Sequence, residues 1–160
     1  MNDKRYGVVP PADQASLSGL DFVQGLVSGA LPHNSMARTL GYDIVAAAPG
    51  RVVVTAMPTA ELLNPAGTVH GGFSATLLDT CMGLAVLTTV DKGFASTTLE
   101  FKISFVRPIT PETGLLRAEG TVVSGGRRVG TAEGRVTDAA GRLLAHATTT
   151  CLIFERPAGR

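Results

Sequence analysis

The chain has 160 residues, with 14 lysines and arginines against 13 aspartates and glutamates, so its formal net charge is only +1. This length is typical of one domain with a substantial core. The near-neutral charge gives no indication of a nucleic-acid or membrane partner, and six Phe, two Tyr and no Trp offer few side chains for stacking on bases. Composition therefore predicts a single globular domain that binds neither nucleic acid nor membrane.

The first forty residues divide into a polar stretch and a helical one. Residues 1–11 are polar and end in the pair Pro10-Pro11, which predicts a flexible N-terminus. They lack the apolar core of a secretory signal, so we expect a cytoplasmic protein. Residues 12–40 carry apolar side chains at helical spacing, above all between residues 17 and 31, and predict an N-terminal helical segment.

Residues 41–154 show the pattern of an α+β domain. Turn residues bound six expected strands, which cover residues 42–47, 51–57, 98–105, 116–123, 129–138 and 143–154. A long apolar segment, residues 71–90, lies between the second strand and the third and predicts a helix. Because helices and strands do not alternate, we expect an antiparallel sheet. Residues 155–160 are expected to form a loose C-terminal tail.

The third expected strand, residues 98–105, has the clearest alternation of apolar and polar residues. Its apolar side chains are Leu99, Phe101, Ile103 and Phe105, and polar residues separate them. Such alternation predicts a strand that buries one face on a core.

The segment from residue 71 to residue 90 is the one around which the rest is organised. Its apolar side chains surround every side of a helical wheel, which predicts a buried central helix. Asp79 is its only charged residue before Asp91, and it also disfavours a membrane span. Burying a carboxylate costs several kcal/mol, roughly, unless it is paired or hydrogen-bonded. Asp79 is therefore a candidate catalytic residue or a carboxylate tied into a helix contact.

The start of this helix has the features of a site for a carbonyl oxygen. In His70-Gly71-Gly72, two residues without side chains stand where backbone N–H groups are not yet paired within the helix. A ligand oxygen could approach these groups closely. Asn64, six residues earlier, can add a side-chain amide donor. Together these groups predict an oxyanion-binding pocket.

The spacing of Gly71 and Asp79 predicts a site shared between two chains. Eight residues of a straight helix separate them by about 12 Å, so one carbonyl group cannot touch both in the same chain. A second copy of the helix, running antiparallel, would bring one residue from each chain together. The result would be a dimer with two shared sites.

Asn64, His70-Gly71-Gly72 and Asp79, at this spacing, resemble the hotdog-fold acyl-CoA thioesterases of the phenylacetate-degradation (PaaI) type. The resemblance covers roughly residues 41–154 and also includes the segments 98–108, 114–120 and 143–150. It implies a hotdog fold, in which about six antiparallel strands wrap a long central helix. It also implies dimers that pair their sheets edge to edge, and usually a homotetramer. The helix within residues 12–31 would be an addition, either packed outside the sheet or serving as a lid over the acyl pocket.

The resemblance also implies a reaction, in which acyl-CoA and water give a free acid and coenzyme A. The Gly71 N–H and the Asn64 amide would polarise the thioester carbonyl. Asp79 of the facing subunit would attack as a nucleophile or activate water as a general base. His70 would hold the loop and the thioester end in place. Coenzyme A would be part of the substrate, and no metal or redox cofactor is expected.

For several further residues the sequence allows either a functional or a structural role. Thr98, or its neighbour Thr97, either orients the attacking water or is an ordinary strand threonine. The basic residues near the expected rim, which would contact coenzyme A phosphates or remain solvated, are Arg107, Arg127 and Arg128.

Other catalytic classes find little support in the residues. The three histidines form no HExxH motif, there is no GxSxG motif, and Cys81 and Cys151 have no metal-like spacing, so reduced core cysteines are expected. A non-catalytic acyl-CoA binding or regulatory module on the same fold is the main alternative, but it needs no charge at position 79. A hydratase or dehydratase would require a second acid–base pair, which we do not find.

Overall fold

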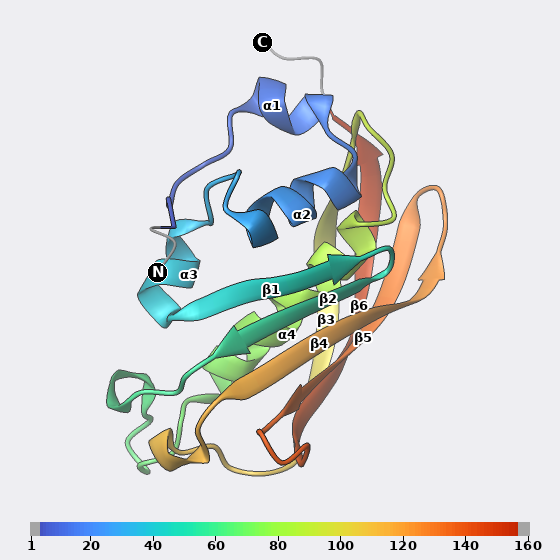
Figure 1. The fold of residues 1–160 in the computed structure, drawn as a ribbon. Helices are drawn as coiled ribbons and strands as arrows, with labels where there is room; N and C mark the ends of the chain where they lie inside the picture. Colours follow the sequence, from blue (N-terminus) through green and yellow to red (C-terminus); the bar gives the residue numbers. More distant parts are fainter. Residues whose placement is uncertain (1–3, 157–160) are drawn as a thin grey trace.

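The computed structural model describes residues 4–156. Six strands and a long helix form the body of the molecule, and three short helices precede them (Figure 1). The elements are α1 (Pro11–Ser16), α2 (Gly19–Ser28), α3 (Ser35–Leu40), β1 (Tyr42–Ala48), β2 (Arg51–Ala56), η1 (Ala60–Leu62), α4 (Gly71–Leu87), β3 (Phe94–Phe105), η2 (Pro111–Thr113), β4 (Leu116–Gly125), β5 (Val129–Thr137) and β6 (Leu143–Glu155).

The strands form one sheet in the order β1-β2-β4-β5-β6-β3, and every neighbouring pair is antiparallel. The sheet curves around α4, as Figure 1 shows. The expected α+β hotdog fold is thus confirmed. Only β3 differs much from its expected bounds: it begins at Phe94, because residues 94–97 extend the pairing along β6 as far as Glu155.

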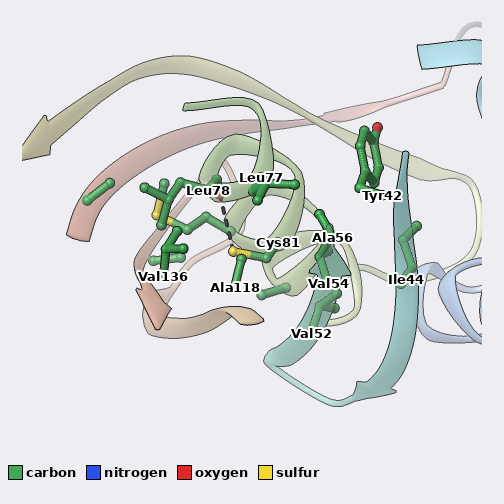
Figure 2. Packing of buried hydrophobic residues seen from close by; sticks show 14 of the residues in the cluster. Tyr42, Ile44, Val52, Val54, Ala56, Leu77, Leu78, Cys81, Ala118 and Val136 are labelled. Atoms are coloured by element: carbon green, nitrogen blue, oxygen red, sulfur yellow. Dashed lines mark hydrogen bonds between the residues drawn. The ribbon is translucent and has the colours of Figure 1, made fainter. Parts of the chain in front are cut away.

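The core lies between α4 and the concave face of the sheet (Figure 2). On the helix, Leu77, Leu78 and Cys81 are fully buried; on the strands, Val54 and Val136 are. Each fully buried aliphatic side chain of this size stabilises the fold by about 1.5–3 kcal/mol relative to its exposure. The central helix is therefore fixed firmly against the sheet.

One stripe of α4 is not fully covered within the protomer. Its half-buried residues are Ala75, Thr76, Asp79, Thr80, Gly83 and Leu84. They recur at intervals of three and four, so they share one face of the helix. The sequence predicted a helix buried on every side, which is incorrect for this face because the sheet covers only the others.

The apolar face of β3 is also more exposed than its alternation predicted. Leu99 and Phe105 are each 58% exposed, and Ile103 is half-buried. Two features explain the difference. β3 is an edge strand, so it lacks a neighbour on one side within the described sheet. Its pairing with β6 is also interrupted between Thr98 and Glu100, which changes the register there.

The predicted N-terminal helix is divided into α1 and α2. Ser18 begins α2 by accepting a hydrogen bond from the Asp21 N–H, at 3.1 Å. Gly19 follows and packs on the end of α4: its N–H donates to the Val90 carbonyl at 2.9 Å, and a Cβ there would lie 1.7 Å from the Leu87 oxygen. This close contact determines where α2 starts.

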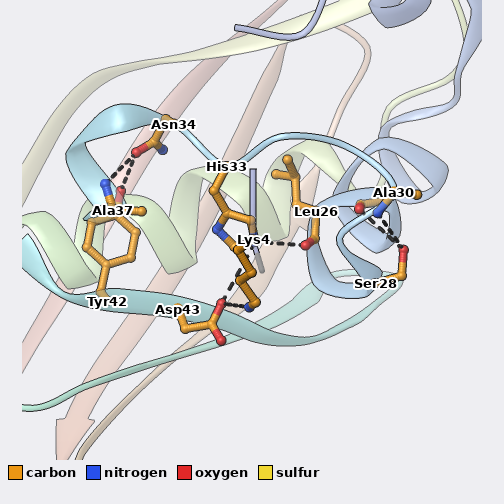
Figure 3. Close-up of polar contacts among 10 residues, drawn as sticks. Lys4, Leu26, Ser28, Ala30, His33, Asn34, Ala37, Tyr42 and Asp43 are labelled. Carbon is orange, nitrogen blue, oxygen red and sulfur yellow. Dashed lines mark hydrogen bonds and ion pairs between the residues drawn. The ribbon is translucent and has the colours of Figure 1, made fainter. Parts of the chain in front are cut away.

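Residues 4–11, part of the segment that the sequence predicted to be flexible, contact the rest of the molecule. Tyr6 forms a parallel bridge with His33, and Lys4 pairs with Asp43 of β1. The buried His33 ring donates through Nε2 to the Leu26 carbonyl of α2, at 2.8 Å (Figure 3). These contacts link the segment to α2 and β1, and the predicted flexibility of residues 1–11 stays a prediction.

The structure describes part of the predicted terminal segments, up to residue 156 at the C-terminal end. Residues 1–3 and 157–160 lie outside the described residues, so the predicted looseness there stays a prediction. In the C-terminal tail, Glu155 belongs to β6 and the Arg156 N–H donates to the Gly93 carbonyl. The predicted boundary between residues 12–40 and the domain 41–154 also remains a prediction. No helix among residues 4–156 has the length and apolarity needed to cross a membrane.

The close approach of β4 to α4 predicts the effect of one substitution. A Cβ on Gly120 would lie 2.4 Å from the Cys81 carbonyl oxygen, a backbone atom that cannot rotate away. We expect Gly120→Ala to lower the free energy of unfolding by about 3 kcal/mol, measured by urea denaturation. Gly125→Ala in the same strand, where no atom lies within 4 Å, is the control. Equal stability of the two variants would contradict this account of the packing.

Candidate active site

His70 shapes the loop that leads into α4. Its Nδ1 accepts a hydrogen bond from the Gly72 N–H at 2.9 Å, which caps the helix. Its own backbone N–H donates to the Leu62 carbonyl at 2.8 Å. A Cβ on Gly72 would lie 2.9 Å from that ring nitrogen, so the glycine makes room for the cap. This geometry suits a residue that holds the loop.

Gly71 presents a free backbone donor at the positive end of the helix. Within the described residues, its N–H makes no hydrogen bond. A Cβ at this position would lie 2.8 Å from the Phe105 ring, so only glycine fits without movement of the ring. Such an N–H group can bind a negatively charged or polarised oxygen.

A cleft of about 410 Å³ opens beside Gly71, and we call it the Gly71 cleft. Its lining residues are Asn64, Thr68, Val69, Gly71, Ser74, Phe105, Val106, Arg107, Pro108, Ile109 and Leu144. The structure therefore brings together three predicted site residues, Asn64, Gly71 and Arg107.

Asn64 uses much of its side chain to shape its own loop. Its amide Nδ2 donates to the Thr68 hydroxyl at 2.9 Å, and its Oδ1 accepts from the Ala66 N–H at 2.9 Å. One amide hydrogen remains for a ligand. The predicted role in polarising a carbonyl thus rests on that single hydrogen.

Asp79 lies in the middle of α4, on the half-buried stripe. The Thr98 hydroxyl of β3 donates to its Oδ1 at 2.8 Å. Among the described residues, no lysine, arginine or histidine forms an ion pair with this carboxylate. Thr97 makes no side-chain hydrogen bond to Asp79 within residues 4–156, so Thr98 is the threonine that contacts the carboxylate.

A second pocket, of about 460 Å³, opens beside this carboxylate, and we call it the Asp79 pocket. Residues 79–87 of α4 and 96–98 of β3 form one side. The other side comes largely from the N-terminal segment, through Gly7, Val8, Val9, Phe22, Leu26, Pro32 and Asn34. Most of these side chains are apolar. The pocket thus combines one carboxylate with walls suited to a hydrocarbon group.

Both cysteines are poor candidates for a nucleophile. Burial raises the pKa of the Cys81 thiol to about 12. Burial also raises the pKa of Cys151, whose sulfur lies 4.0 Å from the Thr98 hydroxyl. Both remain protonated thiols near neutral pH, which matches the expected reduced core cysteines.

The Gly71 cleft and the Asp79 pocket are separate within one protomer. They share no lining residue. Since α4 is continuous from Gly71 to Leu87, the two functional groups lie about 12 Å apart along it. Each protomer therefore presents the two predicted groups in separate places, which we call half-sites; that two chains share one site stays a prediction.

The three arginines proposed for coenzyme A phosphates do not gather in one place. Arg107 lines the Gly71 cleft, and its guanidinium donates to the Leu143 carbonyl at 2.6 Å. Arg127 lines a third cleft with Thr89 and Val90, at the opposite end of α4. Arg128 is exposed in the turn between β4 and β5. Within one protomer, only Arg107 adjoins a half-site.

The remaining titratable groups do not suggest a metal centre. Among residues 4–156, no group of three or more His, Cys, Asp or Glu side chains is placed to hold a metal ion. His33 is buried at the N-terminal segment, and His146 is exposed on β6.

Several lining residues were not identified from the sequence. Ser74 follows Gly71 by three residues, so helical spacing alone could have placed it on the same face. Phe105 could not have been found, because its position over Gly71 depends on the path of β3. For Phe22 and Leu26, helical periodicity indicated an apolar face but not the pocket that this face lines.

Comparison with known proteins agrees with this geometry. Residues 66–145 match the family model described as "Thioesterase superfamily". Among relatives, acyl-coenzyme A thioesterase 13 of Homo sapiens is 36% identical over 72 residues. That match covers 44% of this chain and 51% of the human protein, so it spans about half of the relative's length.

Two solved structures extend the likeness over most of the chain. A phenylacetic acid degradation-related protein from Ralstonia eutropha JMP134 superposes with a TM-score of 0.74 at 32% identity, covering 82% of this chain and 98% of that one. The E. coli PaaI protein superposes with a TM-score of 0.74 at 25% identity, covering 89% and 98%. The resemblance found in the sequence is confirmed: the chain belongs to the thioesterase superfamily and is a thioester hydrolase.

Proposed function

We propose that the protein hydrolyses the thioester of an aryl- or acyl-CoA to a free acid and coenzyme A. One observation carries the proposal: the Asp79 side chain lines a largely apolar pocket and accepts a hydrogen bond from Thr98. Among the described residues, it has no cationic partner. A binding module needs no such carboxylate, whereas in hydrolysis it can act as a general base or a nucleophile. Acyl-coenzyme A is also the substrate in the name of the human relative. We also propose that the protein acts in the cytoplasm.

Each half-site supplies one part of the chemistry. In the general-base route, Asp79 removes a proton from water, whose oxygen attacks the thioester carbon. In the nucleophilic route, the carboxylate attacks directly and water cleaves the resulting anhydride. In both, the Gly71 N–H stabilises the negative oxygen of the intermediate. In the general-base route the carbon–sulfur bond then breaks, and the coenzyme A thiolate takes up the proton that Asp79 removed. In the nucleophilic route this bond breaks as the anhydride forms, and the thiolate takes its proton from the water that later cleaves the anhydride.

His70 and Thr98 position these two groups in the proposed mechanism. Through its cap on Gly72, His70 fixes the start of the helix and hence the direction of the Gly71 N–H. Thr98 holds one oxygen of Asp79 and leaves the other for water or the thioester carbon. Asn64 assists the Gly71 N–H through its remaining amide hydrogen.

A second protomer is needed to join the half-sites. Two surfaces support an antiparallel dimer: the half-buried stripe of α4, and the edge of β3 with its exposed Leu99 and Phe105. A long apolar edge strand readily pairs with another strand. In the dimer, Gly71 of one chain would meet Asp79 of the other. Dimers would pair further into a homotetramer.

The Asp79 pocket would hold the acyl group, and the Gly71 cleft would lead to coenzyme A. Phe22, Leu26 and Leu84 provide apolar walls for an aryl or aliphatic group. Arg107 is placed for a phosphate at the mouth of the cleft. Arg127 and Arg128 could reach that cleft only from a partner protomer. We propose coenzyme A as part of the substrate, with no further cofactor.

Replacing the carboxylate tests the proposed chemistry. We expect Asp79→Asn to lower kcat by at least ~100-fold, because the amide can neither remove a proton nor form an anhydride. The measurement is release of free thiol from aryl, short-chain and long-chain acyl-CoA substrates by the wild type and the variant. The panel also identifies the preferred acyl class.

Asp91→Asn provides a matched control, since Asp91 is an exposed carboxylate beyond the end of α4. It should retain wild-type activity. If Asp79→Asn also retained activity, the assignment of the carboxylate would be wrong. If the wild type bound acyl-CoA and released no thiol, the protein would be a binding module instead.

Mixing two inactive variants tests whether the site is shared. Gly71→Pro removes the N–H donor, and Asp79→Asn removes the carboxylate. In a mixed dimer, one of the two sites has both native groups. Random mixing after unfolding and refolding should therefore restore about a quarter of wild-type activity. A site contained within one chain would show no restoration, and variants refolded separately are the control.

The wall formed by α2 should influence the choice of acyl group. Phe22→Ala enlarges the Asp79 pocket without altering Asp79 or Thr98. We expect the ratio of kcat/KM for long-chain over short-chain substrates to rise about tenfold, as is common for changes of a few methylene volumes. Gln24→Ala, at an exposed position of α2, should leave the ratio unchanged. An equal ratio in both variants would place the acyl group elsewhere.

A further inference from the structure

Ser74 is a buried polar residue in the Gly71 cleft. It lies on the first turns of α4, is only 2% exposed, and lines the cleft together with Gly71 and Asn64. It lies three positions after Gly71, so both belong to the same face of the helix.

The hydroxyl of Ser74 makes no side-chain hydrogen bond with another described residue, although the residue is almost completely buried. Since no fully enclosed side-chain oxygen or nitrogen among residues 4–156 lacks a partner, this hydroxyl must reach the open space of the cleft. The neighbouring threonine differs: the Thr76 hydroxyl donates to the Gly72 carbonyl at 3.0 Å, the usual arrangement for a hydroxyl within a helix. The free hydroxyl of Ser74 is therefore available to a ligand in the cleft.

The surroundings of the cleft favour a hydrogen bond from this hydroxyl. Phe105, Ile109 and Leu144 provide much of the lining, so water competes less for a donor there. The Asn64 amide has already given one of its two hydrogens to Thr68. Beside the Gly71 N–H and the remaining Asn64 hydrogen, Ser74 thus offers a third donor, which no described residue engages.

We propose that Ser74 is a catalytic residue whose hydroxyl donates a hydrogen bond to the thioester carbonyl oxygen, as a second donor beside the Gly71 N–H. This inference rests on the proposed thioesterase function. The hydrogen bond strengthens as negative charge develops on the oxygen, so it lowers the barrier more than it improves substrate binding.

Kinetics of three variants test the proposal. Ser74→Ala should lower kcat by roughly 100-fold with little change in KM, since removal of one oxyanion donor typically has this effect. Ser74→Thr retains a hydroxyl and should recover much of the activity. Thr76→Ala is the matched control and should behave as wild type, because that hydroxyl is engaged within the helix. Ser74→Cys keeps the volume with a weaker donor, and it replaces Ser74→Ala if the alanine variant does not fold.

A pair of non-hydrolysable analogues separates a contact with the carbonyl from a structural role. In one, CH₂ replaces the thioester sulfur and the carbonyl remains; in the other, a thioether, the carbonyl is absent. Ser74→Ala should weaken binding of the ketone analogue about tenfold, the value of a good neutral hydrogen bond, and leave the thioether unchanged. Equal weakening of both analogues, or no change in either, would overturn the inference.

The analogues also distinguish the two proposals from each other. Binding does not require turnover, so the difference between the analogues can be measured even if no thioester is hydrolysed. In that case the thioesterase proposal fails and the Ser74 contact stands. Conversely, an active enzyme in which Ser74→Ala matches the wild type retains the proposed function and loses this residue.

Discussion

The packing of α4 into the concave face of the sheet is the constraint on which the rest of the structure depends. It is possible because glycines face the helix: Gly120 lies against the Cys81 backbone, and a Cβ on Gly134 would meet Met82 at 2.8 Å. Side chains at these positions would push the helix away from the strands. This packing fixes Gly71 and Asp79 relative to each other, because they are parts of the same helix and cannot move independently.

In the proposed mechanism, this rigidity would leave a single protomer chemically incomplete. A straight helix holds its N-terminal donor and its central carboxylate about 12 Å apart, and no loop movement can close that gap. The uncovered stripe of α4 contains Asp79, and the adjacent strand β3 leaves an apolar edge exposed. The association of two chains would therefore both exclude water from Asp79 and bring it to the Gly71 N–H of the other chain. We thus expect activity to depend on the oligomer, which agrees with the separation of the two pockets.

The sequence predicted the fold, its strand order along the chain and the helix that carries the site, because those features follow from periodicity and turn residues. It could not separate Thr97 from Thr98, since an interruption in the pairing of β3 with β6 at residues 98–100 changes which residues face the helix. Nor could it predict that β3 is an edge strand, because alternation shows two faces and not the number of neighbours. The break between α1 and α2 depends on Gly19 meeting the end of α4, a tertiary contact.

The two sides of the Asp79 pocket are held by different interactions. α4 and β3 belong to the core, and Asp79 is fixed there by its helix and by Thr98. The opposite wall is attached through His33, which joins α2 to the N-terminal segment, and through Lys4 and Asp43 (Figure 3). A change in α2 can thus alter the volume offered to the acyl group while the carboxylate keeps its position. If the proposed roles hold, chemistry and acyl selection would depend on separate contacts, and the same central helix could serve different acyl groups.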